Sequence, residues 1–198
     1  MIQTMRTLKY LSLALVCAAV VSCKSKSSVV AQAETPVAAE APQVPEVPEA
    51  PQQPEMLTGK TQRTQLQAGT FGSWFNPEYG DYTVDSGLLE ELKPLLKDVE
   101  ITVFMGTWCG DSKRETPRFY KILDAAGKTK DIELITVDRS KTTPQGLEAG
   151  KDIIRVPTLI FSKDGKELGR IVEYPIESLE ADMLKILKGE PYKHAYAN

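Results

Sequence analysis

Hydrophobic residues in the second half of the chain follow patterns typical of strands. Residues 101–105 and 132–137 are nearly continuous apolar runs of strand length, and the first predicts a buried central strand. Residues 159–162 and 167–172 flank the pair Asp164-Gly165. Because Asp-Gly between two apolar runs is a strong hairpin signal, we expect these two segments to pair as antiparallel strands.

Apolar residues at helical spacing predict three helices. They lie within residues 88–96, 119–126 and 179–187. Pro94 falls inside the first and Pro117 inside the segment that leads into the second. Since proline removes a backbone donor and clashes with the preceding turn, we expect a kink at each, or a split at Pro94.

Three further segments have weaker patterns. Residues 61–68 favour a strand, the aromatic residues between 71 and 82 favour a packed loop, and residues 144–149 favour a short helical piece. The core order is then strand, helix, strand, helix, strand, strand, helix. This order predicts an α/β fold in which a mixed central sheet carries helices on both faces.

The first 22 residues have the organisation of an export signal. Arg6 and Lys9 precede an apolar run at 11–21, which is too short for a membrane span of about 20 residues. Residues 20–23 read Val-Val-Ser-Cys and resemble a bacterial lipobox, in which the cysteine is lipidated and becomes the mature N-terminus. We therefore predict a lipoprotein signal peptide at 1–22; the alternative is an ordinary secretory signal with an incidental cysteine.

The predicted lipid on Cys23 is followed by a segment that cannot form a core. Residues 23–56 are rich in proline, alanine and glutamate, a composition that favours extended polyproline II and predicts a tether for a globular domain at 57–198. We expect a bacterial cell envelope protein, lipid-anchored in a membrane and facing the periplasm or the exterior. Lys24 after the cysteine slightly favours the outer membrane, by resemblance to the enterobacterial sorting rule.

This processing leaves one free thiol. Cys17 would leave with the signal peptide and the Cys23 sulfur would carry the lipid, so that Cys109 remains alone. An exported protein with one odd cysteine suggests chemistry between molecules, because no internal disulfide can form. Cys109 also lies where an apolar strand ends and a helix begins, and the free N–H groups and dipole of a helix start favour a thiolate.

Charge and ligand patterns exclude two classes of site. The 24 Lys and Arg nearly balance the 27 Asp and Glu, and no basic run is interleaved with aromatic residues, so we expect no nucleic-acid partner. His194 is the one histidine, and no Cys/His/Asp cluster has metal-ligand spacing. We therefore expect neither a metal nor a cofactor.

Three motifs in this order of elements resemble the thioredoxin superfamily over roughly residues 85–190. Trp108-Cys109-Gly110 sits at a strand–helix junction, and Pro117 follows eight residues after the cysteine, where thioredoxins kink the same helix. Arg155-Val156-Pro157-Thr158 precedes the Asp-Gly hairpin and resembles the cis-proline loop of the family. The resemblance implies a thioredoxin-like three-layer sandwich.

The resemblance also implies a peptide-binding site around a nucleophilic Cys109. The residues it implies as substrate contacts are Trp108, Gly110, Asp111, Val156 and Pro157. Two positions depart from the family. Ser112 replaces the second, resolving cysteine, and Val103 stands where many thioredoxins bury an aspartate that helps to move protons. We count Ser112 as a second catalytic candidate because its hydroxyl could donate a hydrogen bond to the thiolate.

These departures leave two classes of function open. The first is a monothiol thiol–disulfide oxidoreductase or isomerase that serves redox homeostasis, acting through Cys109 on protein disulfides or thiols of the cell envelope. Without a second cysteine, release needs an external reducing thiol or reductase, or a thiol of the substrate. The second is a non-catalytic peptide-binding or chaperone module that uses the groove at Val156 and Pro157. A weaker alternative is a redox sensor linked through Cys109.

Overall fold

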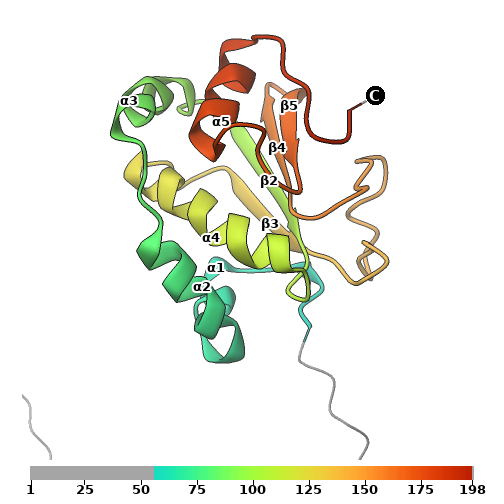
Figure 1. Ribbon diagram of the computed structural model, residues 1–198. Helices are drawn as coiled ribbons and strands as arrows, with labels where there is room; N and C mark the ends of the chain where they lie inside the picture. The colour runs from blue at the N-terminus through green and yellow to red at the C-terminus, as the bar shows by residue number, and fades with distance from the viewer. Residues whose placement is uncertain (1–55, 198) are drawn as a thin grey trace, which may run out of the picture. The chain divides into compact units, whose positions relative to one another are not determined.

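The computed structural model describes residues 56–197, which form a mixed sheet with helices (Figure 1). The predicted signal peptide, Cys23 and all of the predicted tether except Met56 lie outside the described residues. The strands are β1 (Gly59–Lys60), β2 (Glu100–Met105), β3 (Ile132–Thr136), β4 (Thr158–Lys163) and β5 (Lys166–Val172). The helices are α1 (Arg63–Leu66), α2 (Gly69–Asp81), α3 (Ser86–Leu95), α4 (Gly110–Ala125) and α5 (Leu179–Lys188).

The five strands have the order β1-β3-β2-β4-β5. The predicted central strand is confirmed: β2 pairs in parallel with β3 and antiparallel with β4. The predicted hairpin is confirmed as well, since β4 and β5 pair antiparallel across a loop in which Asp164 and Gly165 have φ of 52° and 74°. Two positive φ values define the type I′ turn whose twist matches that of the strands.

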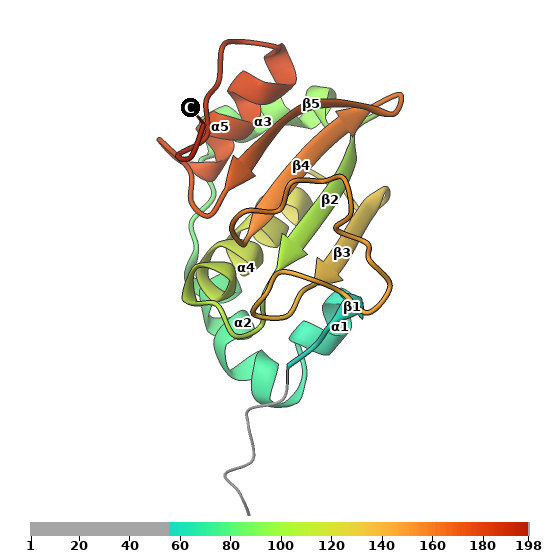
Figure 2. The ribbon, with the colours of Figure 1, turned by 90° about the vertical axis from the view of Figure 1, so that its right-hand side faces the viewer.

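The two faces of the sheet are covered differently. Ile101, Val103 and Met105 point from β2 into a large buried cluster to which all five helices contribute. Phe104, on the opposite face of β2, lies in a smaller cluster that receives no side chain from a described helix. In Figure 2 the segment 138–157 crosses this second face, while α4 lies behind the sheet.

The α/β class, the mixed sheet and the thioredoxin-like fold are therefore as predicted, but the described helices lie on one face and not on both. The reason lies in the segment expected to be helical at 144–149. It forms turns, with Gly146 and Gly150 at positive φ, and the Glu148 carboxylate accepts hydrogen bonds from the amide and the hydroxyl of Thr143. These bonds replace the regular backbone bonds of a helix.

Two predictions for the segment before α3 were wrong. The expected strand at 61–68 is instead α1, preceded by the two-residue strand β1, and the side chains of Gln62 and Gln65 form a capping box at its start. The expected packed loop at 71–82 is instead α2, which continues through Pro77. Nor does a proline split the later helices: α3 continues through Pro94 to Leu95.

The segment containing α1 and α2 is fastened to α4 by one polar and aromatic cluster. The Arg63 guanidinium donates two hydrogen bonds to the Asp124 carboxylate, at 2.9 and 2.7 Å, and lies 4.8 Å from the centre of the Tyr120 ring. The Tyr79 hydroxyl donates to the same carboxylate at 2.7 Å. Burial alone would raise the pKa of Asp124, but the hydrogen bonds from Arg63 and Tyr79 outweigh it and lower that pKa.

Replacing Asp124 with asparagine is expected to lower the free energy of unfolding by roughly 1 kcal/mol, because the ion pair is a third exposed and partly screened by solvent. A carboxyl with a lowered pKa stabilises the fold above its ordinary value of 3.8 and loses that effect as the pH falls through its folded value. Urea unfolding of both proteins between neutral and acidic pH should show the difference shrinking with acid. Asp98→Asn, in a looser exposed pair, is the control.

Candidate active site at Cys109

Cys109 lies at the junction between β2 and α4. It is the N-cap residue of α4, with extended backbone at φ −88° and ψ 128°, and its side chain is partly exposed. Its thiol donates a hydrogen bond to the Val156 carbonyl oxygen at 3.2 Å. Cys109 is a free cysteine, and residues 56–197 contain no other. The structure thus brings together two of the predicted site residues that are 47 positions apart.

The loop that faces the thiol contains a cis peptide bond between Val156 and Pro157. The Thr158 hydroxyl donates to the Arg155 carbonyl at 2.7 Å, and the Glu173 amide donates to the Pro157 carbonyl at 2.7 Å. Within residues 56–197 no group accepts a hydrogen bond from the Val156 amide. The loop is therefore held on both sides of Val156.

Trp108 anchors the loop before Cys109. Its indole Nε1 donates to the Val137 carbonyl at 3.0 Å, and the Arg139 guanidinium lies 5.3 Å from the centre of its ring. Gly106 lies beneath this ring, where a Cβ atom would come within 2.6 Å of it. Glycine at 106 is thus what lets the indole approach the backbone this closely.

Ser112 is fully buried in the first turn of α4. Its hydroxyl oxygen accepts a hydrogen bond from the Gly106 amide at 3.1 Å. The structure has no hydrogen bond between Ser112 and Cys109 among the described residues, so the expected donation to the thiolate is not seen. Ser112 instead joins the first turn of α4 to the loop that carries Trp108 and Cys109.

Three charged residues near the start of α4 are paired with one another. Arg114 contacts Asp111 at 2.7 Å and the buried carboxylate of Glu115 at 2.7 Å. The hydrogen bond with Glu115, supported by that with Asp111, raises the pKa of Arg114 against the opposing effect of burial. Asp111 therefore lies at the rim of the site in an ion pair. Gly110 beside it is exposed, and a Cβ atom there would meet nothing within 4 Å.

Sequence patterns missed the residues beyond the cis-proline loop. Glu173 has a positive φ of 67° and reaches Pro157 through its amide, while Tyr196 near the C-terminus lies against Arg155. No local pattern relates residue 196 to residue 155. The sole sequence signal is Tyr196 itself, an aromatic residue in a polar tail.

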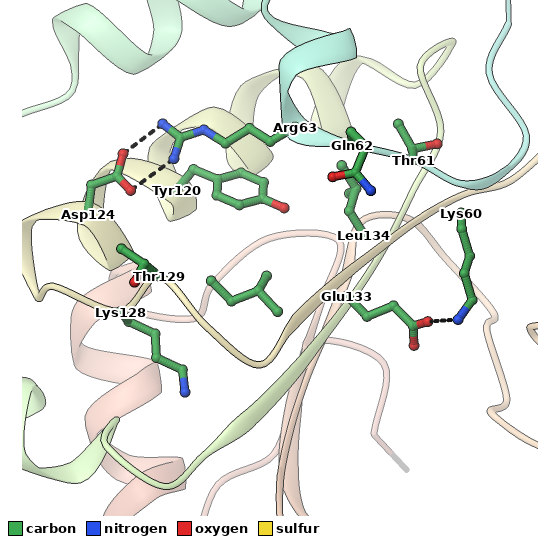
Figure 3. Close-up of a pocket in the computed structure, with 11 residues that line it drawn as sticks. Lys60, Thr61, Gln62, Arg63, Tyr120, Asp124, Lys128, Thr129, Glu133 and Leu134 are labelled. Carbon is green, nitrogen blue, oxygen red and sulfur yellow. Dashed lines mark hydrogen bonds and ion pairs between the residues drawn. The ribbon is translucent and has the colours of Figure 1, made fainter. Parts of the chain in front are cut away.

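A separate hollow of about 500 Å³ lies between β1, α1, α4 and β3, away from Cys109 (Figure 3). Four of its charged side chains form ion pairs: Lys60 contacts Glu133 at 2.6 Å, and Arg63 contacts Asp124. Among residues 56–197 no group of three or more His, Cys, Asp or Glu side chains is placed to hold a metal ion. None of the described helices has the length and apolar character that a membrane crossing requires.

Comparison with known proteins agrees with this geometry. A family model for thioredoxin matches residues 90–185. The thioredoxin of Listeria monocytogenes is 31% identical over 81 residues, which are 40% of this chain and 75% of that protein. The chain belongs to the thioredoxin family. The thioredoxin of Staphylococcus aureus is similar to the same extent, with 34% identity over 83 residues that make up 41% of this chain and 75% of that protein.

A solved structure supports the fold over a longer stretch of this thioredoxin-family chain. A Pseudomonas aeruginosa protein of unknown function superposes with a TM-score of 0.52 and 18% identity, covering 66% of this chain and 93% of that one. At this identity the likeness shows the fold alone. Members of the thioredoxin family act on protein thiols and disulfides, so thiol–disulfide exchange is the class of chemistry to which the chain points.

Proposed function

We propose that this protein is a monothiol thiol–disulfide oxidoreductase or isomerase acting through Cys109. One observation carries the proposal. The Cys109 thiol lies 3.2 Å from the Val156 carbonyl at the start of α4, while the position one turn later holds a buried serine that bonds to Gly106. This arrangement supports the first half of the exchange chemistry, and the second half would need a thiol from another molecule.

The reaction begins when the Cys109 thiolate attacks one sulfur of a substrate disulfide. That S–S bond breaks, a mixed disulfide forms, and the second substrate sulfur leaves as a thiolate that takes up a proton. A low-molecular-weight thiol or a reductase thiol then attacks the Cys109 sulfur and releases the substrate, and a second such thiol restores Cys109 with formation of the external disulfide. If a substrate thiol attacks the substrate sulfur instead, the disulfide is rearranged with no net oxidation.

The surface beside the thiol suits an extended peptide. The amide of Val156 has no hydrogen-bond partner among residues 56–197, and Val156 lies in the same cluster as the partly exposed Cys109 and Trp108. A peptide strand that bonds to this amide would hold its disulfide next to the nucleophile, which gives the orientation that exchange requires. Gly110 leaves room for such a strand, because no atom lies within 4 Å of its missing side chain.

The proposal extends to where the chemistry takes place. Signal-peptide removal after residue 22, lipidation of Cys23 and a tether at 23–56 would place the domain at 57–198 on a membrane of the cell envelope, with the outer membrane favoured. Its partners would then be envelope proteins with disulfides or thiols, together with an external reductant. The support is the lipobox-like sequence and the composition of the tether.

Trapping of mixed disulfides tests this proposal on the full chain. Because no second cysteine can release the substrate, envelope fractions of alkylated cells should contain adducts of the wild-type protein that disappear on reduction. The adducts are expected to be absent from Cys109→Ser and retained in Ser112→Ala, the matched change at the neighbouring position. Cys23→Ala should move the same adducts from the membrane fraction to the soluble fraction.

Other outcomes identify the alternatives. Wild-type protein that yields no more adducts than Cys109→Ser contradicts the enzymatic proposal. Retention of partner proteins by Cys109→Ala would favour the non-catalytic binding module. The observation that supports this alternative is the absence of a thiol at position 112. An adduct made of two copies of this chain would favour the Cys109-linked sensor.

A further inference from the structure

The C-terminal segment folds back onto the loop that faces Cys109. Tyr192 anchors its first part, since its hydroxyl donates to the buried Asp182 carboxylate at 2.8 Å. A few residues later the Tyr196 ring packs against Tyr174, with ring centroids 6.3 Å apart and an interplanar angle of 67°. The tail thus crosses from α5 to the segment that follows β5.

Tyr196 joins three residues that surround the cis-proline loop, and we call Arg155, Glu173, Tyr174 and Tyr196 the Tyr196 clasp. The Arg155 guanidinium lies 5.1 Å from the centre of the Tyr196 ring. The Tyr196 hydroxyl donates a hydrogen bond to the Glu173 carboxylate, and the same carboxylate contacts Arg155 at 4.0 Å. Tyr196 therefore contacts the Arg155 cation through its ring and the Glu173 carboxylate through its hydroxyl.

The backbone connects the clasp to the loop that faces the nucleophile at two positions. Arg155 directly precedes Val156, whose carbonyl accepts the hydrogen bond from the Cys109 thiol. Glu173 donates its amide to the Pro157 carbonyl at 2.7 Å. The residues that Tyr196 contacts are thus those that hold the loop on either side of Val156.

The loop needs such a support from outside the sheet. The segment 138–157 that leads into it contains no helix or strand, and the Arg155 side chain is 54% exposed. A strand or helix would fix this backbone by regular hydrogen bonds. Here the Ile154 amide donates to the Asp152 carbonyl at 3.1 Å, and the other contacts come from side chains, namely Arg170 on Lys151 and Tyr196 on Arg155.

We propose that Tyr196 is a positioning residue for the cis-proline loop and thereby sets the rate at which Cys109 exchanges with a peptide disulfide. The inference rests on the proposed function, because it assigns a role in that exchange. A peptide bound along Val156 reaches the thiol in reactive geometry while the clasp fixes the loop, and a shift of about 1 Å there is costly for the rate. A small disulfide that does not bind along Val156 is insensitive to the clasp.

The test compares two probes on the full chain carrying Cys17→Ser and Cys23→Ser, so that Cys109 is the one thiol that can react. The first is a short peptide whose single cysteine carries a thiopyridyl disulfide, and the second is 2,2′-dithiodipyridine. In both cases the Cys109 thiolate forms a mixed disulfide and pyridine-2-thione leaves, so that one absorbance reports both rates. Tyr196→Ala should slow the peptide reaction about tenfold, the scale expected for lost ring and cation contacts, with less than about a twofold change for the small probe.

Matched variants separate positioning from general damage to the fold. Tyr196→Phe keeps the ring contacts and loses the bond to Glu173, so its peptide rate should lie between those of wild type and Tyr196→Ala. Tyr79→Phe removes a hydroxyl–carboxylate bond of the same kind, from α2 to Asp124, outside the tail and the clasp, and should leave the ratio of the two rates unchanged. Circular dichroism and the thermal midpoint establish that each variant is folded, and Arg155→Ala replaces Tyr196→Ala if that protein does not fold.

The two proposals fail in different ways. If the wild-type protein reacts with neither probe, the proposed function is wrong. If the wild type reacts and Tyr196→Ala keeps the wild-type ratio of peptide to small-probe rates, the proposed function stands and the role of the clasp is wrong. An equal slowing with both probes also contradicts positioning, because it shows damage to the thiol itself.

Discussion

Replacing Ser112 with cysteine is expected to turn the single-thiol site into one that closes its own disulfide. Residues 109 and 112 lie at the N-cap and in the first turn of α4. Side chains three apart at a helix start are about 5–6 Å apart between Cβ atoms, which a small backbone adjustment brings within reach of a disulfide. The bond that Ser112 now accepts from Gly106 would weaken, at a cost of about 1 kcal/mol.

The expected gain is in the release of substrate. A neighbouring thiol competes with an external one at a much higher effective concentration, so the mixed disulfide should resolve roughly a hundredfold faster than with millimolar external thiol. Stopped-flow measurement of peptide release gives this rate, and mass spectrometry shows the loss of two hydrogens as the 109–112 bond closes. Ser112→Ala is the control, and release at the wild-type rate from Ser112→Cys would contradict the expectation.

The gain in steady-state reduction should be smaller than the gain in release. Val103 is fully buried in the large cluster on the helical face, so no ionisable group of β2 lies there to exchange protons with the new thiol. Reduction of the 109–112 disulfide requires a proton for each thiol formed. Turnover should therefore depend on the external reductant, and its rate should rise in proportion to the concentration of that reductant.

Local chemistry explains which elements were predictable. The hairpin follows from Asp164 and Gly165, which adopt positive φ at low cost, and α5 ends where Gly189 takes φ of 70°. In α2 residues of the same kind led to the wrong prediction of a loop, since Gly72, Pro77 and Gly80 are typical loop residues. Tertiary packing overrides them, because the Phe75 side chain is fully buried in the cluster that α4 and the sheet complete.

The site was predictable only as far as the family resemblance reaches. The resemblance places Val156 beside Cys109, and in the structure the Cys109 thiol lies 3.2 Å from the Val156 carbonyl oxygen. It gives no guide to Ser112, because the direction of a hydroxyl is decided by the nearest unbonded backbone group, here the Gly106 amide. Nor does it reach Tyr196, whose role depends on how a tail without regular structure returns to the loop.

The difference between the two faces of the sheet leads to a second large expected effect. Phe161 of β4 and Phe104 of β2 are both fully buried, but Phe161 packs at 5.9 Å against Phe119 of α4, whereas Phe104 lies under the segment 138–157. Phe161→Ala should lower the free energy of unfolding by about 3–5 kcal/mol, because helices and sheet cannot collapse into the cavity. Phe104→Ala should cost roughly 2–3 kcal/mol, because a covering loop can close inward.

The order of the two variants should reverse for the exchange rate: Phe104→Ala, which costs less stability, should lose more activity. Phe104 shares its cluster with Val156 and Cys109, so inward movement of the loop displaces the carbonyl that faces the thiol. At a temperature where both proteins are folded, Phe104→Ala should slow exchange with the peptide disulfide while Phe161→Ala keeps the wild-type rate. Urea unfolding and the exchange assay on the same samples measure both effects. Equal costs in stability with equal rates would show that the loop face is as rigid as the helical face, and would remove the basis for assigning its support to Tyr196.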